Sequence, residues 1–296
     1  MKIVYHRRLP RFEYVAPGSL ADVLELLSAK GGRAKLLAGG TDLIPQLKRR
    51  EVETPQVVVD LKRIAGLNNI SYDEALGLRL GCLATIAQVE GSAVVRQKFP
   101  ILHQAAASIG SRQVRNRGTI AGNLCNAVPS ADSAPALLTL EARLRLTSPE
   151  GTRTIGVEEF FTGPKTTVLK PTEILEEIQV PNPPPGSRGI YLKLAPRDAM
   201  DLAIVGVAVL LTVEDGTCRD IRIGLGAVAP TPMRARQAEA VIRGREVNEA
   251  LIGEVAETAS AECRPIDDHR ASAWYRREMV KVLTARAIRK ASSGGT

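Results

Sequence analysis

The sequence has 296 residues and a mass of 31.8 kDa, enough for two modest domains or for one domain with a substantial appendage. Hydrophobic residues make up 44% and aromatic residues 3%, which predicts a globular protein with a mainly aliphatic core. The longest apolar run, from Leu202 to Val213, is well short of the roughly 20 residues of a membrane helix. No apolar signal region follows the charged start MKIVYHRRLPRF. We therefore expect a cytoplasmic protein without a membrane span.

The formal net charge is +8, a balance that would suit nucleic acid, an acidic partner protein or an anionic cofactor. The Lys and Arg residues are dispersed and rarely interleaved with aromatic residues, which argues against nucleic acid. Four cysteines, Cys82, Cys125, Cys218 and Cys263, lie far apart without a CxxC pair. This spacing predicts buried, reduced thiols and no metal or cluster site in the chain.

The first part of the chain alternates predicted strands and helices. A strand at residues 12–15 precedes a helix that begins after Ser19, an N-cap residue, and ends at Gly31 and Gly32. The stretch AKLLAGGTDLIPQLKRR then predicts a strand, a tight turn and a helix with a basic end. The segments QVVVDL and LRLGCL predict two more strands, and one helix is expected from Thr85 or Ile86 toward Val95.

The middle of the chain, at about residues 101–146, contains an alanine-rich helix, the turn-rich segment GSRQVRNRGTIAGNLCNAVPSAD and an apolar helix around Pro135 to Glu141. The stretch PNPPPGSRG at 181–189 predicts a linker. Antiparallel strands are expected after it, with a hairpin turn at Asp215 and Gly216. Helical spacing dominates from Met233 onward.

The loop from Ala38 to Asp42 is the first candidate binding site. Gly39 and Gly40 remove side-chain bulk and permit positive φ, so that consecutive backbone N–H groups would converge on an anion such as a diphosphate. The helix that follows would add the positive end of its dipole. The alternative is a glycine turn that is capped by Thr41 or Asp42 and binds nothing.

The segment RNRGTIAGN, residues 115–123, is the second candidate. Gly118 and Gly122 again allow close backbone approach, while Thr119 and Asn123 offer neutral hydrogen bonds. Neither loop spells GxGxxG or a P-loop, so a Rossmann fingerprint is excluded. Arg115 and Arg117 would neutralise phosphate, although a structural or subunit-facing role is favoured for both.

The sequence offers no catalytic side chain. His6, His103 and His269 lie in unremarkable surroundings and form no convincing Ser-His-Asp or Cys-His set, so any chemistry would come from a cofactor. Asp132 lies just before an apolar helix, where its carboxylate would either cap that helix or accept a hydrogen bond from ribose hydroxyls.

Four segments in order along the chain carry a resemblance to a known family. They are AGGTDLIPQLK, QVRNRGTIAGNLCNAVPSADSAPALLTLEA, YLKLAPRDAMDLAIVGVA and PIDDHRASAWYRREMVKVLTARA. Over roughly residues 10 to 290, the chain resembles the medium, FAD-binding subunit of molybdenum hydroxylases, which include xanthine dehydrogenases and carbon monoxide dehydrogenases.

The resemblance implies an α+β fold. It would consist of a vanillyl-alcohol-oxidase-type FAD-binding fold with two α+β subdomains, at residues 1–56 and 57–180. The linker at 181–189 would lead to a C-terminal domain of a small antiparallel sheet and helices at 190–291, and then to a flexible tail at 292–296.

The resemblance also implies the cofactor-binding residues, with both glycine loops on the FAD diphosphate and Lys193 near the isoalloxazine. Lys193 would stabilise negative charge on the reduced ring, and the alternative is a surface lysine. Several relatives have an aromatic residue after the aspartate of the strand motif, whereas here Leu202 follows Asp201. The implied residues are Ala38, Gly39, Gly40, Thr41, Asp42, Ile109, Gly110, Thr119, Ile120, Ala121, Gly122, Asn123, Asp132, Leu169 and Lys193.

The function implied by the resemblance is that of an oxidoreductase subunit that relays electrons through FAD to an external acceptor. Partners would be a large molybdenum-cofactor subunit and a small subunit with 2Fe-2S clusters, assembled as a dimer of heterotrimers. The alternative is a noncatalytic scaffold subunit of the same complex without flavin. Because the substrate would be selected in the large subunit, this chain does not specify it.

Overall fold

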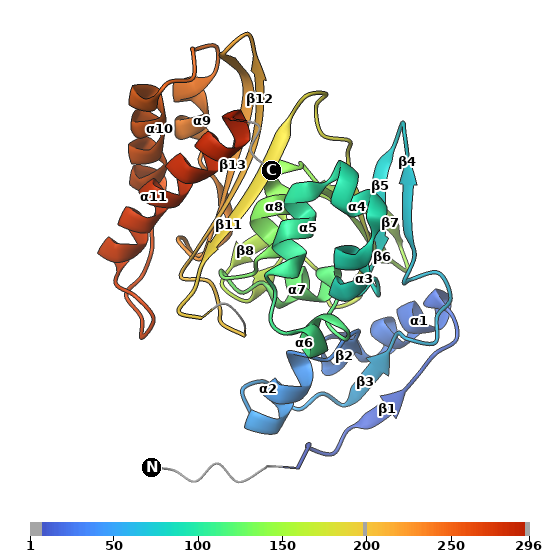
Figure 1. The fold of residues 1–296 in the computed structure, drawn as a ribbon. Coiled ribbons are helices and arrows are strands. Elements are labelled where there is room, and N and C mark those ends of the chain that lie inside the picture. Colours follow the sequence, from blue (N-terminus) through green and yellow to red (C-terminus); the bar gives the residue numbers. More distant parts are fainter. Residues whose placement is uncertain (1–7, 198–199, 294–296) are drawn as a thin grey trace.

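The computed structural model describes residues 8–197 and 200–293, so residues 1–7 of the first expected subdomain and residues 294–296 of the expected tail lie outside it. Figure 1 shows three successive parts. We call them the N-terminal lobe (residues 13–60), the middle lobe (70–180) and the C-terminal lobe (188–292). Each contains both helices and strands, which confirms the predicted α+β class.

The N-terminal lobe is a parallel sheet in the order β1-β3-β2, formed by β1 (Glu13–Val15), β3 (Val57–Asp60) and β2 (Ala34–Leu37). It also contains α1 (Leu20–Lys30), a short 3-10 turn (Gly31–Arg33) and α2 (Leu43–Arg49). Ser19 caps α1 and Gly31 ends it, as predicted, and the expected strand, turn and helix around the first glycine loop are present. β3 is the central strand of this sheet, although the expected subdomain boundary at residue 56 would separate it from β1 and β2.

The middle lobe is built on an antiparallel sheet in the order β4-β5-β10-β6-β7, with helices on the side nearer the C-terminal lobe (Figure 1). Its strands are β4 (Ile70–Asp73), β5 (Gly77–Gly81), β6 (Arg143–Ser148), β7 (Gly151–Gly156) and β10 (Ile174–Val180), and a small hairpin is formed by β8 (Phe161–Gly163) and β9 (Thr166–Thr167). Its helices are α3 (Ile86–Gly91), α4 (Ala93–Lys98), α5 (Pro100–Ala107), α6 (Arg112–Arg115), α7 (Ile120–Asn126) and α8 (Ser133–Thr139).

The single helix expected from residue 85 or 86 toward Val95 is wrong, because the chain forms two short helices there. Thr85 begins α3 with a capping box that includes Gln88. Ser92 then ends α3 and starts α4, since its hydroxyl accepts a hydrogen bond from the N–H of Val95. A serine that caps a new helix competes with continuation of the old one.

The C-terminal lobe is an antiparallel sheet in the order β11-β12-β13-β14 with three helices, as expected. Asp215 and Gly216 form the predicted hairpin turn between β12 and β13, both with positive φ. The first strand starts at Arg188, so the last two residues of the expected linker belong to the sheet. The elements are β11 (Arg188–Leu194), β12 (Val205–Glu214), β13 (Thr217–Gly226), β14 (Met233–Arg234), α9 (Arg236–Ile242), α10 (Glu249–Glu262) and α11 (Ala273–Ser292).

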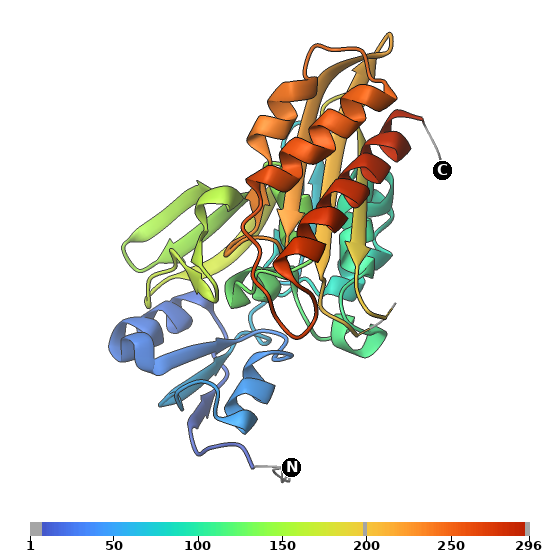
Figure 2. The same cartoon turned by 90° about the vertical axis from the view of Figure 1, so that its left-hand side faces the viewer.

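Glycines let the C-terminal sheet pack closely on the middle lobe. A Cβ at Gly224 would lie 2.4 Å from the carbonyl oxygen of Pro135 in α8, and one at Gly189 would lie 2.8 Å from Cβ of Ile101 in α5. The other face of the sheet is covered by α9, α10 and α11, which lie in front of the strands in Figure 2. Tyr191 of β11 belongs to the core of the middle lobe, so the two lobes share buried surface.

Three of the four cysteines, Cys82, Cys218 and Cys263, are buried free thiols, as predicted. Cys125 is exposed on α7, which corrects the prediction for that residue. Within residues 8–197 and 200–293, no three His, Cys, Asp or Glu side chains gather as a metal site, and no helix is long and apolar enough to cross a membrane.

The packing predicts opposite effects for two Gly→Ala variants. Gly224→Ala should lower the free energy of unfolding by about 1–3 kcal/mol, because the new methyl group meets backbone that cannot move without shifting α8. Gly253→Ala, in open space on the exposed side of α10, should raise it by about 0.5–1 kcal/mol. Chemical denaturation of both variants measures the difference. Equal stabilities would contradict the close packing of the C-terminal sheet on the middle lobe at Gly224.

Candidate functional site

The two glycine loops lie against each other. The first joins β2 to α2, and the second joins α6 to α7. A Cβ at Gly39 would lie 2.1 Å from the carbonyl oxygen of Arg117 and 2.8 Å from Cα of Gly118, so no side chain fits between the loops. Thr41 also approaches Gly118, since its hydroxyl would lie 3.3 Å from a Cβ there. The backbones of two distant segments therefore form one surface.

The first loop presents free hydrogen-bond donors. Gly40 has a φ of +76°, a conformation in which an L side chain is strained. Within residues 8–197 and 200–293, the main-chain N–H groups of Gly39, Gly40, Thr41 and Asp42 donate no hydrogen bond. The carboxylate of Asp42 makes no capping hydrogen bond to α2, so the alternative of an Asp42-capped turn is wrong. These donors are left for solvent or for a ligand.

The second loop is held rigidly by its own polar side chains. The hydroxyl of Thr119 accepts a hydrogen bond from the N–H of Gly122 at 2.9 Å and thereby caps α7. The carbonyl of Gly118 accepts one from Ile86, which ties the loop to the start of α3. The Asn123 side chain accepts a hydrogen bond from Ser133 at 2.6 Å. Thr119 and Asn123 thus shape the loop instead of offering their side chains freely.

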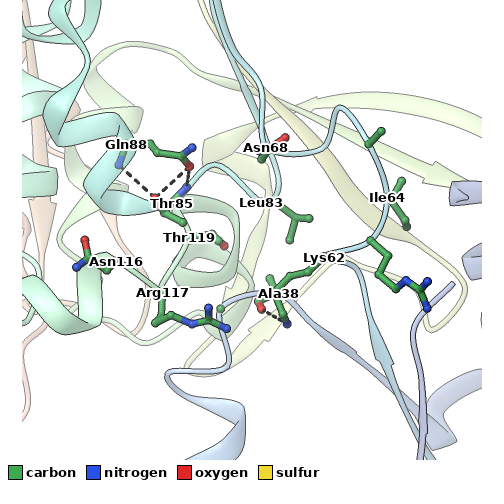
Figure 3. Close-up of a pocket in the computed structure, with 13 residues that line it drawn as sticks. Ala38, Lys62, Ile64, Asn68, Leu83, Thr85, Gln88, Asn116, Arg117 and Thr119 are labelled. Carbon is green, nitrogen blue, oxygen red and sulfur yellow. Dashed lines mark hydrogen bonds between the residues drawn. The ribbon is translucent and has the colours of Figure 1, made fainter. Parts of the chain in front are cut away.

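A cavity of about 560 Å³ opens beside the joined loops (Figure 3). Lys62 projects toward it from the end of β3, with its ammonium 2.7 Å from Asp60 and donating to the carbonyl of Ala38 at 3.1 Å. Burial favours the neutral form of Asp60, but hydrogen bonds from Lys62 and Tyr14 outweigh it and lower the pKa of Asp60 below its usual value. The cavity is lined by Ala38, Gly39, Lys62, Arg63, Ile64, Ala65, Asn68, Leu83, Thr85, Gln88, Asn116, Arg117 and Thr119.

Lys62 and most of the other lining residues were not predicted from the sequence. A usable signal was present, because Lys62 directly follows the predicted buried strand QVVVDL. Leu37 and Asp60 are paired in the parallel ladder, so β2 and β3 end side by side. Ligands of parallel sheets bind outside the carboxyl ends of the strands, which is where Lys62 and the first loop meet.

Arg115 and Arg117 differ in their surroundings. Arg115 forms an ion pair with Glu90 at 2.7 Å and donates to the carbonyl of Ile109 at 3.2 Å. Its predicted structural role is confirmed. Arg117 lines the cavity, and among the described residues no carboxylate lies within ion-pair distance of it. This position does not support a structural role for Arg117, and the alternative of a subunit-facing role stays a prediction.

Asp132 and Lys193 form a buried ion pair across the seam between the middle and C-terminal lobes. The Lys193 ammonium lies 2.8 Å from one carboxylate oxygen of Asp132 and donates to the carbonyl of Ser108 at 3.0 Å. The side chain of Lys193 is 12% exposed and that of Asp132 is 7% exposed, so the alternative of a surface lysine is wrong. Asp132 makes no capping bond to α8, which excludes that alternative as well. Burial raises the pKa of Asp132, against the effect of Lys193.

Contacts connect this ion pair to the glycine loops. Ser133, which follows Asp132, binds Asn123 of the second loop. Ile109 and Gly110 follow Ser108, and Gly110 has a φ of +54°. Leu169 is partly buried against the core of the middle lobe. These contacts link the ion pair to the second loop through Ser133 and place Ile109 and Gly110 directly after Ser108, which accepts from Lys193.

Comparison with known proteins identifies both halves of the chain. Residues 10–183 match the family described as FAD binding domain in molybdopterin dehydrogenase. Residues 190–291 match the CO dehydrogenase flavoprotein C-terminal domain. The class of protein is thus a flavoprotein component with an FAD-binding domain and a flavoprotein C-terminal domain, which confirms the expected fold class.

Individual relatives match over nearly the full length. The glyceraldehyde dehydrogenase medium chain of Sulfolobus acidocaldarius is 36% identical over 281 residues, which cover 95% of this chain and 98% of the relative. The xanthine dehydrogenase FAD-binding subunit of Escherichia coli O157:H7 is 34% identical, covering 95% and 97%. Carbon monoxide dehydrogenase from Hydrogenophaga pseudoflava matches with a TM-score of 0.94 and 35% identity, covering 98% and 100%. This chain belongs to the family of FAD-binding medium subunits of molybdenum hydroxylases, and it is an oxidoreductase component.

The contact between the loops predicts that Gly39→Ala is costly even without a ligand. The added methyl group would overlap the Arg117 carbonyl, and separating the loops should lower the free energy of unfolding by about 1–3 kcal/mol. Gly18→Ala is the matched control, because nothing lies within 4 Å of a Cβ there. Denaturation of the flavin-free proteins checks this, and a Gly39→Ala protein as stable as Gly18→Ala would contradict the packing.

Proposed function

We propose that this chain binds FAD between its glycine loops and relays electrons from a 2Fe-2S subunit to an external acceptor. The observation that carries the proposal is the backbone contact between Gly39 and the Arg117–Gly118 peptide. This contact joins the free N–H groups of the first loop to the fixed start of α7. The joined backbone surface of the two loops suits a dinucleotide diphosphate, because oriented backbone amides bind phosphate without the help of a side chain.

Cations beside the loops support the assignment of a doubly charged anion. Lys62, Arg63 and Arg117 all line the cavity. Arg117 emerges from the peptide that packs on Gly39, so its backbone lies close to the first loop. Charge-assisted hydrogen bonds to phosphate are roughly twice as strong as neutral ones.

We assign the cavity to the nucleotide half of FAD. Its size lies within the range of about 300–1,000 Å³ that is typical of small-molecule sites. Ile64 and Leu83 provide apolar wall, while Asn68 and Asn116 provide amide groups. This assignment leaves the loops for the diphosphate and the seam for the other half of the cofactor.

The remaining implied residues would surround the diphosphate or the flavin half of the cofactor. Thr41 and Asp42 extend the first loop, and Thr119 to Asn123 form the second. Ile109, Gly110, Asp132, Leu169 and Lys193 would line the flavin itself, with the Lys193 ammonium held in place by Asp132 and the Ser108 carbonyl. When bound, FAD supplies the ability to hold one or two electrons, which connects one-electron clusters to two-electron acceptors.

We propose the partners from the relatives. Several are called medium chains, among them that of carbon monoxide dehydrogenase from Afipia carboxidovorans, which is 36% identical. The expected partners are a large molybdenum-cofactor subunit and a small 2Fe-2S subunit, assembled as a dimer of heterotrimers in the cytoplasm. The excess of positive charge on this chain favours acidic surfaces on those partners.

The first test is flavin content. The purified protein should carry about one FAD per chain or take it up when FAD is added, because the first loop offers backbone donors that a diphosphate can accept from. Absorption spectra and flavin released by acid measure this. A folded, colourless protein that does not take up FAD would instead support the scaffold alternative.

A second prediction concerns the charge of the cavity. Arg117→Gln should weaken FAD binding by roughly ten- to a hundredfold, the loss of one charged hydrogen bond of about 1.5–3 kcal/mol. Arg286→Gln, an exposed arginine on α11, is the matched control and should leave the affinity unchanged. Fluorescence titration of the flavin-free proteins with FAD provides the dissociation constants. Equal affinities for the two variants would refute the assignment of Arg117.

A further inference from the structure

The Asp132–Lys193 ion pair has a third member that the sequence reading did not identify. Tyr191 lies two residues before Lys193 on β11, so both side chains point to the same face of the sheet. Its hydroxyl donates to the second carboxylate oxygen of Asp132 at 2.8 Å, while Lys193 holds the first. Tyr191 is only 6% exposed. The carboxylate of Asp132 therefore accepts hydrogen bonds from two donors on one strand of the C-terminal lobe.

The surrounding structure fixes the position of the Tyr191 hydroxyl. The N–H of Tyr191 donates to the side-chain oxygen of Gln104 in α5 at 2.7 Å, which anchors the strand to the middle lobe. Gly206 of β12 pairs with Lys193 across the sheet. A Cβ at Gly206 would lie 2.9 Å from the Tyr191 hydroxyl oxygen. The glycine leaves the space that the hydroxyl needs to reach Asp132.

The charge of this group depends on both donors. Burial favours the neutral form of a carboxylic acid, and it raises the pKa of Asp132. Hydrogen bonds from Lys193 and Tyr191 favour the charged form. If the hydroxyl were removed, one carboxylate oxygen would lose its protein donor in a buried place. Protonation of Asp132 would then leave the Lys193 ammonium without its counter-charge.

We propose that Tyr191 is a positioning residue of the flavin site, which keeps Asp132 ionised and oriented so that the charge of Lys193 is balanced and fixed. The proposal rests on the proposed function, because it takes the cofactor to bind beside Lys193. Tyr191 and Lys193 come from β11, while Asp132 and Ser108 come from the middle lobe. The C-terminal lobe thereby sets the electrostatics at a site whose glycine loops belong to the other two lobes.

The experiment measures the midpoint potential of bound FAD. In Tyr191→Phe, loss of the negative charge on Asp132 should favour the more negative reduced cofactor. We expect a rise of about 30 mV, which corresponds to a tenfold change in a two-electron equilibrium. Asp132→Asn should raise the potential in the same direction, and Lys193→Met should lower it. Tyr72→Phe is the matched control, because that hydroxyl binds Glu74 at an exposed site.

A double-mutant cycle separates positioning from a merely structural role. If Tyr191 acts through Asp132, adding Tyr191→Phe to Asp132→Asn should shift the potential no further. An equal shift in both backgrounds, or no shift in Tyr191→Phe alone, would overturn the proposal. Gly206→Ala offers a second route, since it displaces the hydroxyl without removing it and should also raise the potential.

The outcomes also distinguish this proposal from the proposed function. If the wild-type protein neither carries nor takes up FAD, the proposed function fails. If the wild-type protein binds FAD and the potential of Tyr191→Phe equals that of Tyr72→Phe, only the role of Tyr191 fails. Lowered thermal stability of Tyr191→Phe with an unchanged potential would assign the hydroxyl to folding alone and would likewise overturn the proposal.

Discussion

The contact between Gly39 and the Arg117–Gly118 backbone is the constraint on which the site depends. It joins a loop of the parallel N-terminal sheet to a loop between two helices of the middle lobe. The two glycines of the first loop serve different needs: Gly39 permits the contact, and Gly40 permits a φ of +76°. Both needs are structural, so the glycines alone do not demand a ligand. In the described part of the chain, the four N–H groups of this loop donate no hydrogen bond within the protein, which leaves them available to a ligand or to solvent.

A second backbone approach supports the other half of the site. Gly224 and Gly189 bring the C-terminal sheet onto α8 and α5, which places β11 beside Ser108 and Asp132. Without this seam, Lys193 would lose both of its hydrogen-bond partners. In the proposed function the C-terminal lobe would therefore contribute to the binding site, although the glycine loops belong to the other two lobes.

The predictions that succeeded rest on signals within a few residues. Ser19, Gly31 and the Asp215–Gly216 turn identify helix ends and a hairpin because their effects are local. The resemblance supplied Asp132 and Lys193, but not their pairing, since they lie 61 positions apart. Nothing near Asp132 in the sequence distinguishes a helix cap from the acceptor of a buried lysine. Tyr191 was missed for the same reason, because packing between lobes decides that its hydroxyl meets Asp132. Lys62 was missed although its partners, Asp60 and Ala38, lie at the ends of neighbouring strands of one sheet.

The net charge of the chain says less about its ligand than the positions of individual charged residues do. A net charge of +8 fits several kinds of partner, and many of the arginines that contribute to it form ion pairs within the chain. Arg234 is buried against Glu239, and Arg276 binds Asp268, so each of these two cations is neutralised by a carboxylate of the same chain. Arg63 and Arg117 line the cavity, and in the described part of the chain neither has a carboxylate within ion-pair distance. Unpaired charge that faces a cavity attracts an anion more specifically than dispersed surface charge does. The positions of Arg63 and Arg117 therefore argue for a phosphate-bearing ligand, whereas the net charge of the chain does not.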